Sequence, residues 1–382
     1  MIKIGITEKH GIAEELSKFP PPNVKYKWIS PKKHYIDRFV TSSAKGVLNY
    51  FEDTEIDLIE APLFPILTKQ NWIYTPADIH TALNFGFWGL PIPRKIRLVL
   101  LRNLFMRKNF KRLIFKSQAG KNTLRDMLSP DDELWSKVDV VYPAVRTIND
   151  DMIRFNTKMI NILFLGNFFP KGGAHVLDAF EELLKKFSNI TLRICSRTDL
   201  GTSNTQLAQE YWDRIKNNNK IFFGYVSRTE LLNKILPETD LFVMPTYRDS
   251  YGYAIEEAMA YGIPVISTNL FAIPELVEHR KSGFLINVQQ FDYIREFRNY
   301  RVSSIPKEFH RYMSSEVFKY MDVLVSNFDL RKAMGLAGLK IARQKFSFEK
   351  RNAKMAEIYR MATGKDISSV LFDGTNIAPF RQ

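Results

Sequence analysis

Cysteine is nearly missing from this chain, since its 382 residues include only Cys195. One thiol cannot close an internal disulfide, so the cysteine content does not indicate a secreted, disulfide-stabilised protein. We expect Cys195 to be a small core residue in a strand. The sequence also lacks any window of about twenty uncharged apolar residues, which a membrane-spanning helix would need.

The first residues, MIKIGITEKHG, lack the apolar segment of a secretory signal peptide. We therefore expect a cytoplasmic protein, with peripheral attachment to the inner face of a membrane as an option. The hydrophobic fraction of 45% is typical of globular proteins, and 382 residues are enough for two domains. The net charge of +14 favours an acidic partner such as phosphates, nucleic acid or anionic lipid.

Acidic residues are absent between Arg94 and Arg125, where Leu98, Leu101 and Phe105 recur at helical spacing. The basic residues of this segment are Arg94, Lys95, Arg97, Arg102, Arg107, Lys108, Lys111, Arg112, Lys116, Lys121 and Arg125. A basic amphipathic helix is typical of attachment to anionic membranes. A core helix with a charged face, or a positive rim that attracts an anionic substrate, would show the same pattern. No recognised nucleic-acid-binding motif accompanies it.

Short apolar runs alternate with helical patterns along the chain. We expect strands at residues 2–6, 24–29, 56–62, 71–76, 112–117, 138–143, 160–166, 190–195, 220–224, 240–245 and 264–268. We expect helices at residues 174–187, from Ser227, from about Gly252 and after Phe346; Ser227 and Glu230 have the spacing of a capping box. This alternation predicts an α/β fold with mostly parallel sheets whose strands are buried on both faces.

The polar segment at residues 143–159 lacks periodicity and precedes a new apolar strand. We therefore predict an N-terminal domain at residues 1–152 and a second domain at residues 153–345. The remaining helix and tail, residues 346–382, are expected to cross back to the first domain.

The stretch PTYRDSYGYAIEEAMAYGIPVIST, residues 245–268, places acidic residues around a helix start between two predicted strands. Ligands bind at the carboxyl edge of parallel strands, where the first N–H groups of a helix attract phosphate. Gly252 allows the backbone to approach such a ligand. Asp249 lies before the helix and Glu257 within it, where a carboxylate accepts hydrogen bonds from sugar hydroxyls. Alternatively, Asp249 only caps the helix, while Glu256 and Glu257 form a solvated face.

Several motifs in residues 160–287 agree together with one known family, namely GNFFPKGG, FFGYVSRTELL and DLFVMPTYRDSYGYAIEEAMAYGIPVIST. The segment resembles the nucleotide-binding half of GT-B glycosyltransferases of the retaining, family-4 type. The resemblance implies two Rossmann-like domains facing across a cleft. It also implies transfer of a hexose from a nucleotide diphosphate sugar, with UDP or GDP as the candidate nucleotide. The acceptor would be a hydroxyl of a glycan or of a lipid-linked molecule.

The Glu-x7-Glu pair of that family reads Asp249-x7-Glu257 here. The resemblance implies that Glu257 binds the ribose. It implies that Asp249, one methylene shorter than the usual glutamate, contacts the transferred sugar as a catalytic residue. The backbone N–H groups of Ser250, Tyr251 and Gly252 would face the sugar and the diphosphate.

The loop FLGNFFPKGG resembles the Gly-Arg…Lys-Gly loop of the family, whose cations face the diphosphate. Gly166 and Lys171 match it, whereas Asn167 replaces the arginine. We expect Lys171 to contact phosphate, and we consider Arg197, after the next strand, a candidate substitute for the arginine. The FFGYV segment matches the loop that holds the base, where Tyr225 would pack either on the base or on the protein.

The N-terminal half resembles the family only in its layout. Gly11 opens a helix after the first strand and would approach the acceptor or the phosphate, unless it only forms a turn. His80 follows a strand at the sheet edge, where family members often place a histidine near the transferred sugar. We treat His80 as a candidate catalytic residue, with a structural histidine as the alternative. No spacing of His, Cys or Asp is typical of a metal site, so we expect no metal and no cofactor beyond the nucleotide sugar.

Other classes of function are compatible with these residues. A sugar-nucleotide epimerase or a sugar phosphorylase would use a similar sheet, although the first half shows no convincing acid–base set for an epimerase. A non-catalytic protein that binds membranes or nucleic acid would need the basic segment but not the pair Asp249 and Glu257.

Overall fold

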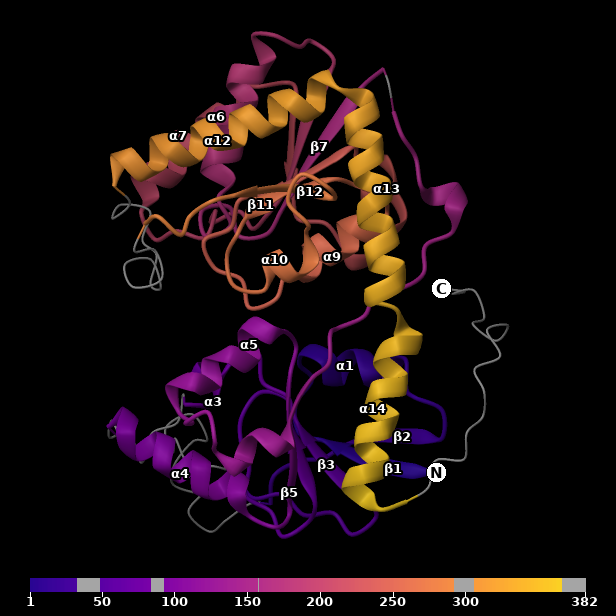
Figure 1. Ribbon diagram of the computed structural model, residues 1–382. Coiled ribbons are helices and arrows are strands. Elements are labelled where there is room, and N and C mark those ends of the chain that lie inside the picture. Colours follow the sequence, from indigo (N-terminus) through magenta and orange to yellow (C-terminus); the bar gives the residue numbers. More distant parts are fainter. Residues whose placement is uncertain (33–48, 84–92, 157, 292–305, 366–382) are drawn as a thin grey trace. The chain divides into compact units, whose positions relative to one another are not determined.

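The computed structural model of the chain describes residues 1–32, 49–83, 93–156, 158–291 and 306–365 (Figure 1). The chain divides into two compact units. The first contains Met1–Ala144 and Phe348–Gln382, and the second contains Val145–Ser347. The sequence-based boundaries were 152/153 and 345/346. None of the helices within the described ranges combines the length and the hydropathy that crossing a membrane requires.

A six-stranded parallel sheet forms the centre of the first unit, in the order β2-β1-β3-β4-β5-β6. The strands are β1 (Ile2–Ile6), β2 (Val24–Trp28), β3 (Leu58–Ala61), β4 (Trp72–Tyr74), β5 (Phe110–Phe115) and β6 (Val138–Val140). The helices are α1 (Gly11–Lys18), α3 (Ile79–Ala82), α4 (Arg94–Met106), α5 (Gln118–Asn122) and α14 (Phe348–Thr363), with 3-10 turns at Thr123–Asp126 and Glu133–Lys137. The strand order reverses between β1 and β3.

Both faces of this sheet are buried. Leu58 and Ile73 belong to a core that also contains the apolar side chains of β1. Trp72 and Phe115 belong to a second core with Phe105 of α4. Because successive side chains of a strand point to opposite faces, burial on both sides explains why these strands appear as continuous apolar runs.

The last helix, α14, belongs to the first unit. Met355 lies in the same core as β1. Arg351 donates a hydrogen bond of 2.9 Å to the carboxylate of Glu15, and the hydroxyl of Tyr359 donates one of 2.6 Å to Glu60. The chain therefore returns after the second unit to complete the core of the first.

The second unit contains a six-stranded parallel sheet in the order β12-β11-β10-β7-β8-β9. The strands are β7 (Ile160–Leu165), β8 (Ile190–Cys195), β9 (Ile221–Gly224), β10 (Leu241–Met244), β11 (Val265–Thr268) and β12 (Gly283–Ile286). The α-helices are α6 (Gly173–Leu184), α7 (Thr205–Lys216), α8 (Arg228–Glu230), α9 (Tyr253–Ala260), α10 (Ile273–Leu276), α12 (Lys307–Ser326) and α13 (Phe328–Lys345). A π-helical turn at Leu231–Ile235 and 3-10 turns at Asp150–Met152 and Leu236–Glu238 complete it.

Two helix pairs cover this second sheet. Helix α12 lies along α6, and α13 lies along α9 (Figure 1). The strand order reverses between β7 and β10, which pair directly, with Leu241 opposite Ile162. At such a reversal the connections leave the sheet on opposite faces, and ligands bind at its carboxyl edge. The loops that follow β7 and β10 therefore occupy the position expected for a binding site.

Candidate functional site

Two glycines, Gly166 and Gly172, allow the loop after β7 to lie against the end of β10. Gly166 has a φ of 128°, and a β-carbon there would lie 2.9 Å from Cγ of Lys171. Gly172 has a φ of 81°, and a β-carbon there would lie 2.3 Å from the carbonyl oxygen of Pro245. Only glycine adopts such conformations without strain. The two glycines thus let the β7 loop turn into α6 directly against the end of β10.

Lys171 joins the two loops. Its Nζ donates hydrogen bonds to the carbonyl oxygen of Arg248, at 2.7 Å, and to Oδ2 of Asp249, at 2.6 Å. Oδ1 of Asp249 accepts a hydrogen bond of 3.0 Å from the backbone N–H of Tyr251. The side chains of Lys171 and Asp249 are 22% and 16% exposed. A cation and a carboxylate are therefore held together, in partial contact with solvent, immediately before α9.

Helix α9 begins at this point. Gly252 is its N-cap residue, with a φ of 110° and no side-chain cap. Tyr251 is fully buried and Ser250 is exposed. The positive end of the helix dipole and the ammonium group of Lys171 thus lie at the same edge of the sheet, an arrangement that favours a bound anion.

Glu257 lies on α9 and is paired with Arg228 of α8. The guanidinium group binds both carboxylate oxygens, with one of the two bonds at 2.7 Å. The Glu257 side chain is 13% exposed, whereas that of Arg228 is 64% exposed. Glu256 is fully buried. The alternative that both acids form a solvated face is therefore wrong.

The cap predicted for α8 is present, because the Ser227 hydroxyl accepts a hydrogen bond of 3.1 Å from the N–H of Glu230. The helix itself ends after three residues and continues as a π-helical turn. This start places Arg228 beside α9. The sequence predicted the cap but gave no indication of the pair with Glu257.

The other residues expected around the nucleotide, Arg197, Asn167 and Tyr225, differ in their contacts and in their exposure to solvent. Arg197 forms an ion pair of 2.7 Å with Asp199, so its guanidinium group is engaged there. Asn167 contributes its backbone oxygen, which accepts a hydrogen bond of 2.9 Å from the N–H of Lys171. Tyr225 is 83% exposed, so the alternative that it packs into the core is wrong.

His80 and Gly11 belong to the first unit. His80 lies in α3, with its Nε2 3.6 Å from Oδ2 of Asp126. Gly11 is the first residue of α1 and follows β1. Both residues come after strands of the parallel sheet, as expected from the sequence, and their functional roles stay predictions.

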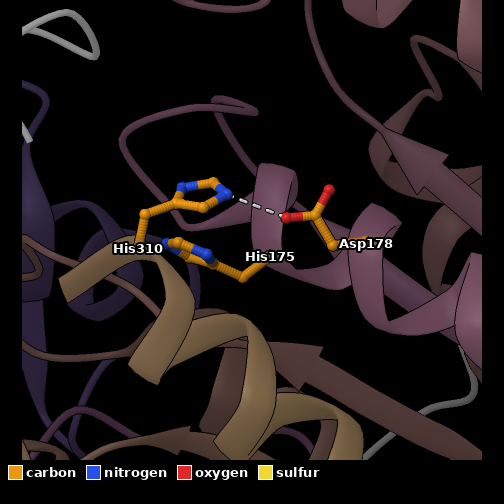
Figure 2. A group of neighbouring side chains, drawn as sticks. All are labelled: His175, Asp178 and His310. Atoms are coloured by element: carbon orange, nitrogen blue, oxygen red, sulfur yellow. Dashed lines mark hydrogen bonds and ion pairs between the residues drawn. The ribbon is translucent and has the colours of Figure 1, made fainter. Parts of the chain in front are cut away.

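The second unit contains a polar cluster that the sequence analysis did not predict. His175 and Asp178 of α6 and His310 of α12 come together, with one potential ligand atom from each within 4.8 Å of the others (Figure 2). Nε2 of His310 lies 2.9 Å from Oδ2 of Asp178. The spacing of His175 and Asp178 places them on one face of a helix, but nothing in the sequence indicates that His310 joins them.

Residues 145–296 match the sequence model of the family described as glycosyl transferases group 1. This part of the chain is similar in sequence to group 1 glycosyltransferases. It contains Lys171, Asp249 and Glu257 together with all six strands of the second sheet. The relation to GT-B glycosyltransferases, inferred from the sequence motifs, is thereby confirmed, while the retaining mechanism stays a prediction.

Curated relatives cover only part of the chain. A protein from the cps region of Klebsiella pneumoniae is 26% identical over 52% of this chain and 56% of its own length. The capsular polysaccharide biosynthesis glycosyltransferase CapM of Staphylococcus aureus is 22% identical over 72% of this chain and 66% of its own length. The putative colanic acid biosynthesis glycosyltransferase WcaL of Escherichia coli is 26% identical over 42% of this chain and 44% of its own length. The matches thus span less than two thirds of these proteins.

Solved structures resemble nearly the whole length of the chain. HepE of Anabaena, solved in complex with UDP, has a TM-score of 0.63 and 15% identity, covering 94% of this chain and 99% of HepE. WaaG, a glycosyltransferase of lipopolysaccharide biosynthesis, has a TM-score of 0.58 and 12% identity, covering 96% of this chain and 100% of WaaG. The fold prediction of two parallel-sheet α/β domains, the GT-B fold, is confirmed.

Proposed function

We propose that this protein transfers a hexose from a nucleoside diphosphate sugar to a hydroxyl of a glycan acceptor, with retention of configuration and without a metal ion. The observation that carries the proposal is the position of Lys171, whose Nζ lies within 2.7 Å of oxygen atoms of Arg248 and Asp249 in the segment before α9. A cation and a helix N-terminus at the point where the strand order reverses suit a diphosphate.

Each of the candidate residues binds a different part of the donor. Lys171 and the first N–H groups of α9 stabilise the negative charge that develops on the leaving diphosphate. Glu257 accepts hydrogen bonds from the ribose hydroxyls, because two bonds from Arg228 leave further lone pairs on its oxygens. Asp249, whose carboxylate accepts a hydrogen bond from Lys171, contacts the transferred sugar in this proposal. Tyr225, being exposed, is available to the base.

The names of similar proteins support the choice of substrates. The Anabaena structure contains UDP, so we propose UDP as the first nucleotide to test. CapM and WcaL are named for capsular polysaccharide and colanic acid biosynthesis, which favours a glycan acceptor.

Binding of the donor is tested by thermal shift with UDP, GDP and dTDP and with one sugar derivative of each. We expect at least one pair to raise the melting temperature, since a ligand that binds only the native state stabilises it. Glu257→Ala should abolish the rise, and Glu238→Ala, an exposed acid of the same unit, should preserve it. No rise with any nucleotide would contradict the proposal.

Products separate this proposal from its alternatives. A glycosyltransferase releases free nucleoside diphosphate when an acceptor is added. An epimerase changes the sugar while it stays linked to the nucleotide, and a phosphorylase requires inorganic phosphate. A protein that only binds membranes or nucleic acid would release nothing.

We further propose that the acceptor is reached at an anionic membrane surface through α4. The second half of this helix buries Leu101 and Phe105, as the core-helix alternative predicted. Its first half exposes Ile96, Val99 and Leu100, which are 51%, 59% and 47% exposed. Apolar side chains among cations are suited to the headgroup region of anionic lipids.

Only part of the basic segment is available for such a surface. Arg102 pairs with Asp132 at 2.8 Å, and Lys116 is buried. Lys95 is exposed in the first turn of α4, and Lys108 is exposed two residues after the helix ends. We therefore assign membrane attachment to the exposed part of α4 and not to the whole basic segment. Attachment through α4 would place the protein peripherally on the cytoplasmic face of the membrane.

A further inference from the structure

A chain of hydrogen bonds connects the loop after β10 with helices α6 and α12. The hydroxyl of Tyr247 bonds to Nε2 of His175. Nδ1 of His175 lies 2.8 Å from Oγ of Ser314, and that oxygen lies 2.8 Å from Oδ2 of Asp178. His310 bonds to the same carboxylate oxygen, as Figure 2 shows. All of these residues belong to the second unit.

The carboxylate fixes the direction of every bond in this chain. Burial favours a protonated Asp178, but hydrogen bonds from His310, Arg214 and Ser314 outweigh it and hold the pKa below its ordinary value. An ionised carboxylate only accepts, so the hydroxyl of Ser314 donates to it. Ser314 then accepts from Nδ1–H of His175, which leaves Nε2 as the acceptor for the hydroxyl of Tyr247.

A neutral His175 is consistent with this assignment. The side chain is fully buried, and its burial together with the neighbouring His310 lowers the pKa of His175 to about 3. The imidazole therefore carries one proton at neutral pH and has one acceptor nitrogen. Tyr247 supplies the single donor that this nitrogen needs.

A metal ion fits these groups less well than the hydrogen bonds do. Oδ1 of Asp178 accepts from Arg214 at 2.7 Å, and Oδ2 accepts from both His310 and Ser314. Both nitrogens of His175 are also engaged. A metal would have to displace these bonds beside a guanidinium group, whose charge opposes a second cation.

Tyr247 is fixed at both its backbone and its side chain. It lies between the end of β10 and Asp249, and its N–H donates a hydrogen bond of 3.3 Å to the carbonyl oxygen of Pro170, the residue before Lys171. Its ring is 4% exposed and packs edge-on against His175, with 5.6 Å between the ring centroids. Loss of the hydroxyl bond would therefore loosen the segment that carries Asp249, while the backbone bond next to Lys171 would remain.

We infer that Tyr247 is a positioning residue for the donor sugar. Its hydroxyl bond to His175 holds the segment 245–252 so that Asp249 faces Lys171 and the sugar of the bound donor. Ser314 and Asp178 hold His175 in the tautomer that accepts this bond. The inference rests on the proposed function, since it assigns the sugar contact to Asp249.

The test is a double-mutant cycle between Tyr247→Phe and Asp249→Asn. Calorimetry compares the affinities for a free nucleoside diphosphate and for its sugar derivative, using UDP and UDP-glucose or the pair with the largest thermal shift. Tyr247→Phe should change the affinity for the free diphosphate by less than about twofold and reduce the preference for the sugar derivative by about fivefold or more. The double variant should be no worse than Asp249→Asn alone, because both changes act on one contact.

Controls separate positioning from loss of stability. Thr239→Val removes a buried hydroxyl, bonded at 2.7 Å to the Ile235 carbonyl, before β10 at the opposite edge of the sheet. It should leave both affinities unchanged. Ser314→Ala breaks the same series of hydrogen bonds at a distance from the loop and should reproduce the effect of Tyr247→Phe. This variant therefore provides the test if Tyr247→Phe does not fold.

Additive effects of the two changes, or an unchanged preference in Tyr247→Phe, would overturn the inference while the proposed function stands. Failure of the unmodified protein to bind any nucleotide or nucleotide sugar would overturn both.

Discussion

Arg228 holds the carboxylate of Glu257 through both of its terminal nitrogens, although the two residues are 29 positions apart and lie on different helices. The pair orients the carboxylate of Glu257, whose side chain is only 13% exposed. A fixed carboxylate of this kind recognises vicinal hydroxyls more selectively than a mobile one, because no orientation has to be imposed at binding.

Glu257→Gln should therefore reduce discrimination at the ribose. We expect the affinity for UDP to fall by about tenfold, since a charged hydrogen bond to each hydroxyl is replaced by a neutral one. The affinity for 2′-deoxy-UDP should fall much less, so that the variant hardly distinguishes the two. Calorimetry measures both constants, with Glu238→Gln as the control. An equal loss for both ligands would mean that Glu257 acts elsewhere.

Lys171 should act on the phosphates alone. Lys171→Met keeps most of the apolar stem but removes the charge, and we expect the affinity for UDP to fall by about 10- to 100-fold. The affinity for uridine, which has no phosphate, should hardly change. Lys185→Met, at an exposed position on the far end of α6, provides the matched control. A loss of uridine binding of the same size would indicate a collapsed loop instead of a missing phosphate contact.

The exposed half of α4 should determine membrane binding. Val99→Glu with Leu100→Glu should strongly reduce flotation with phosphatidylglycerol vesicles, because carboxylates would have to enter an anionic, apolar interface. Lys95→Glu should weaken it as well, at about 1 kcal/mol for the cation lost. Leu336→Glu, on an exposed apolar side chain of α13, should have no effect. Undiminished flotation of the first variant would disprove attachment through α4.

Glu60 should make stability depend on pH. Burial raises its pKa to about 7, against the opposing hydrogen bonds from Tyr359 and Thr75. In the unfolded chain the carboxyl group ionises near its ordinary value of 4.5. Its contribution is therefore complete below about pH 4.5 and is lost as the pH rises to about 7, at about 1.4 kcal/mol per pH unit and about 3 kcal/mol in all.

Glu60→Gln removes this titration without changing the size of the side chain. Relative to the unmodified protein, we expect a higher melting temperature at pH 8 and no gain at pH 5. Thermal unfolding at a series of pH values measures the difference, with the exposed Glu55→Gln as the control. A gain of the same size at both pH values would show that the carboxyl group is ionised throughout.

Local features of the structure follow closely from the sequence. Strands β1 and β8 have the predicted limits, residues 2–6 and 190–195, and a polar residue, Thr7 or Ser196, follows the end of each. The cap at Ser227 and the start of α9 after Gly252 were also predicted, since each depends on residues a few positions apart. Strand β12 was missed because its apolar run covers only four residues. The helices α12 and α13 were missed as well, although Phe309, Met313 and Val317 of α12 recur at helical spacing.

The contacts that define the candidate site depend on the order of the strands in the sheet and not on neighbouring residues in the sequence. The sequence singled out Lys171, Asp249 and Glu257 as separate motifs, and their residue types and spacing determined the family. It could not pair Lys171 with Asp249 or Arg228 with Glu257, and it did not place Tyr247 on His175.

The sequence by itself thus determined the α/β class, most strands and the residues suited to a nucleotide sugar, because periodicity, caps and glycine turns act over a few residues. Only the tertiary structure decided which of those residues meet. Contacts between residues far apart in the chain, such as Arg228 with Glu257, 29 positions apart, and Tyr359 with Glu60, 299 positions apart, arise from the order in which parallel strands pair. Local composition does not encode that order.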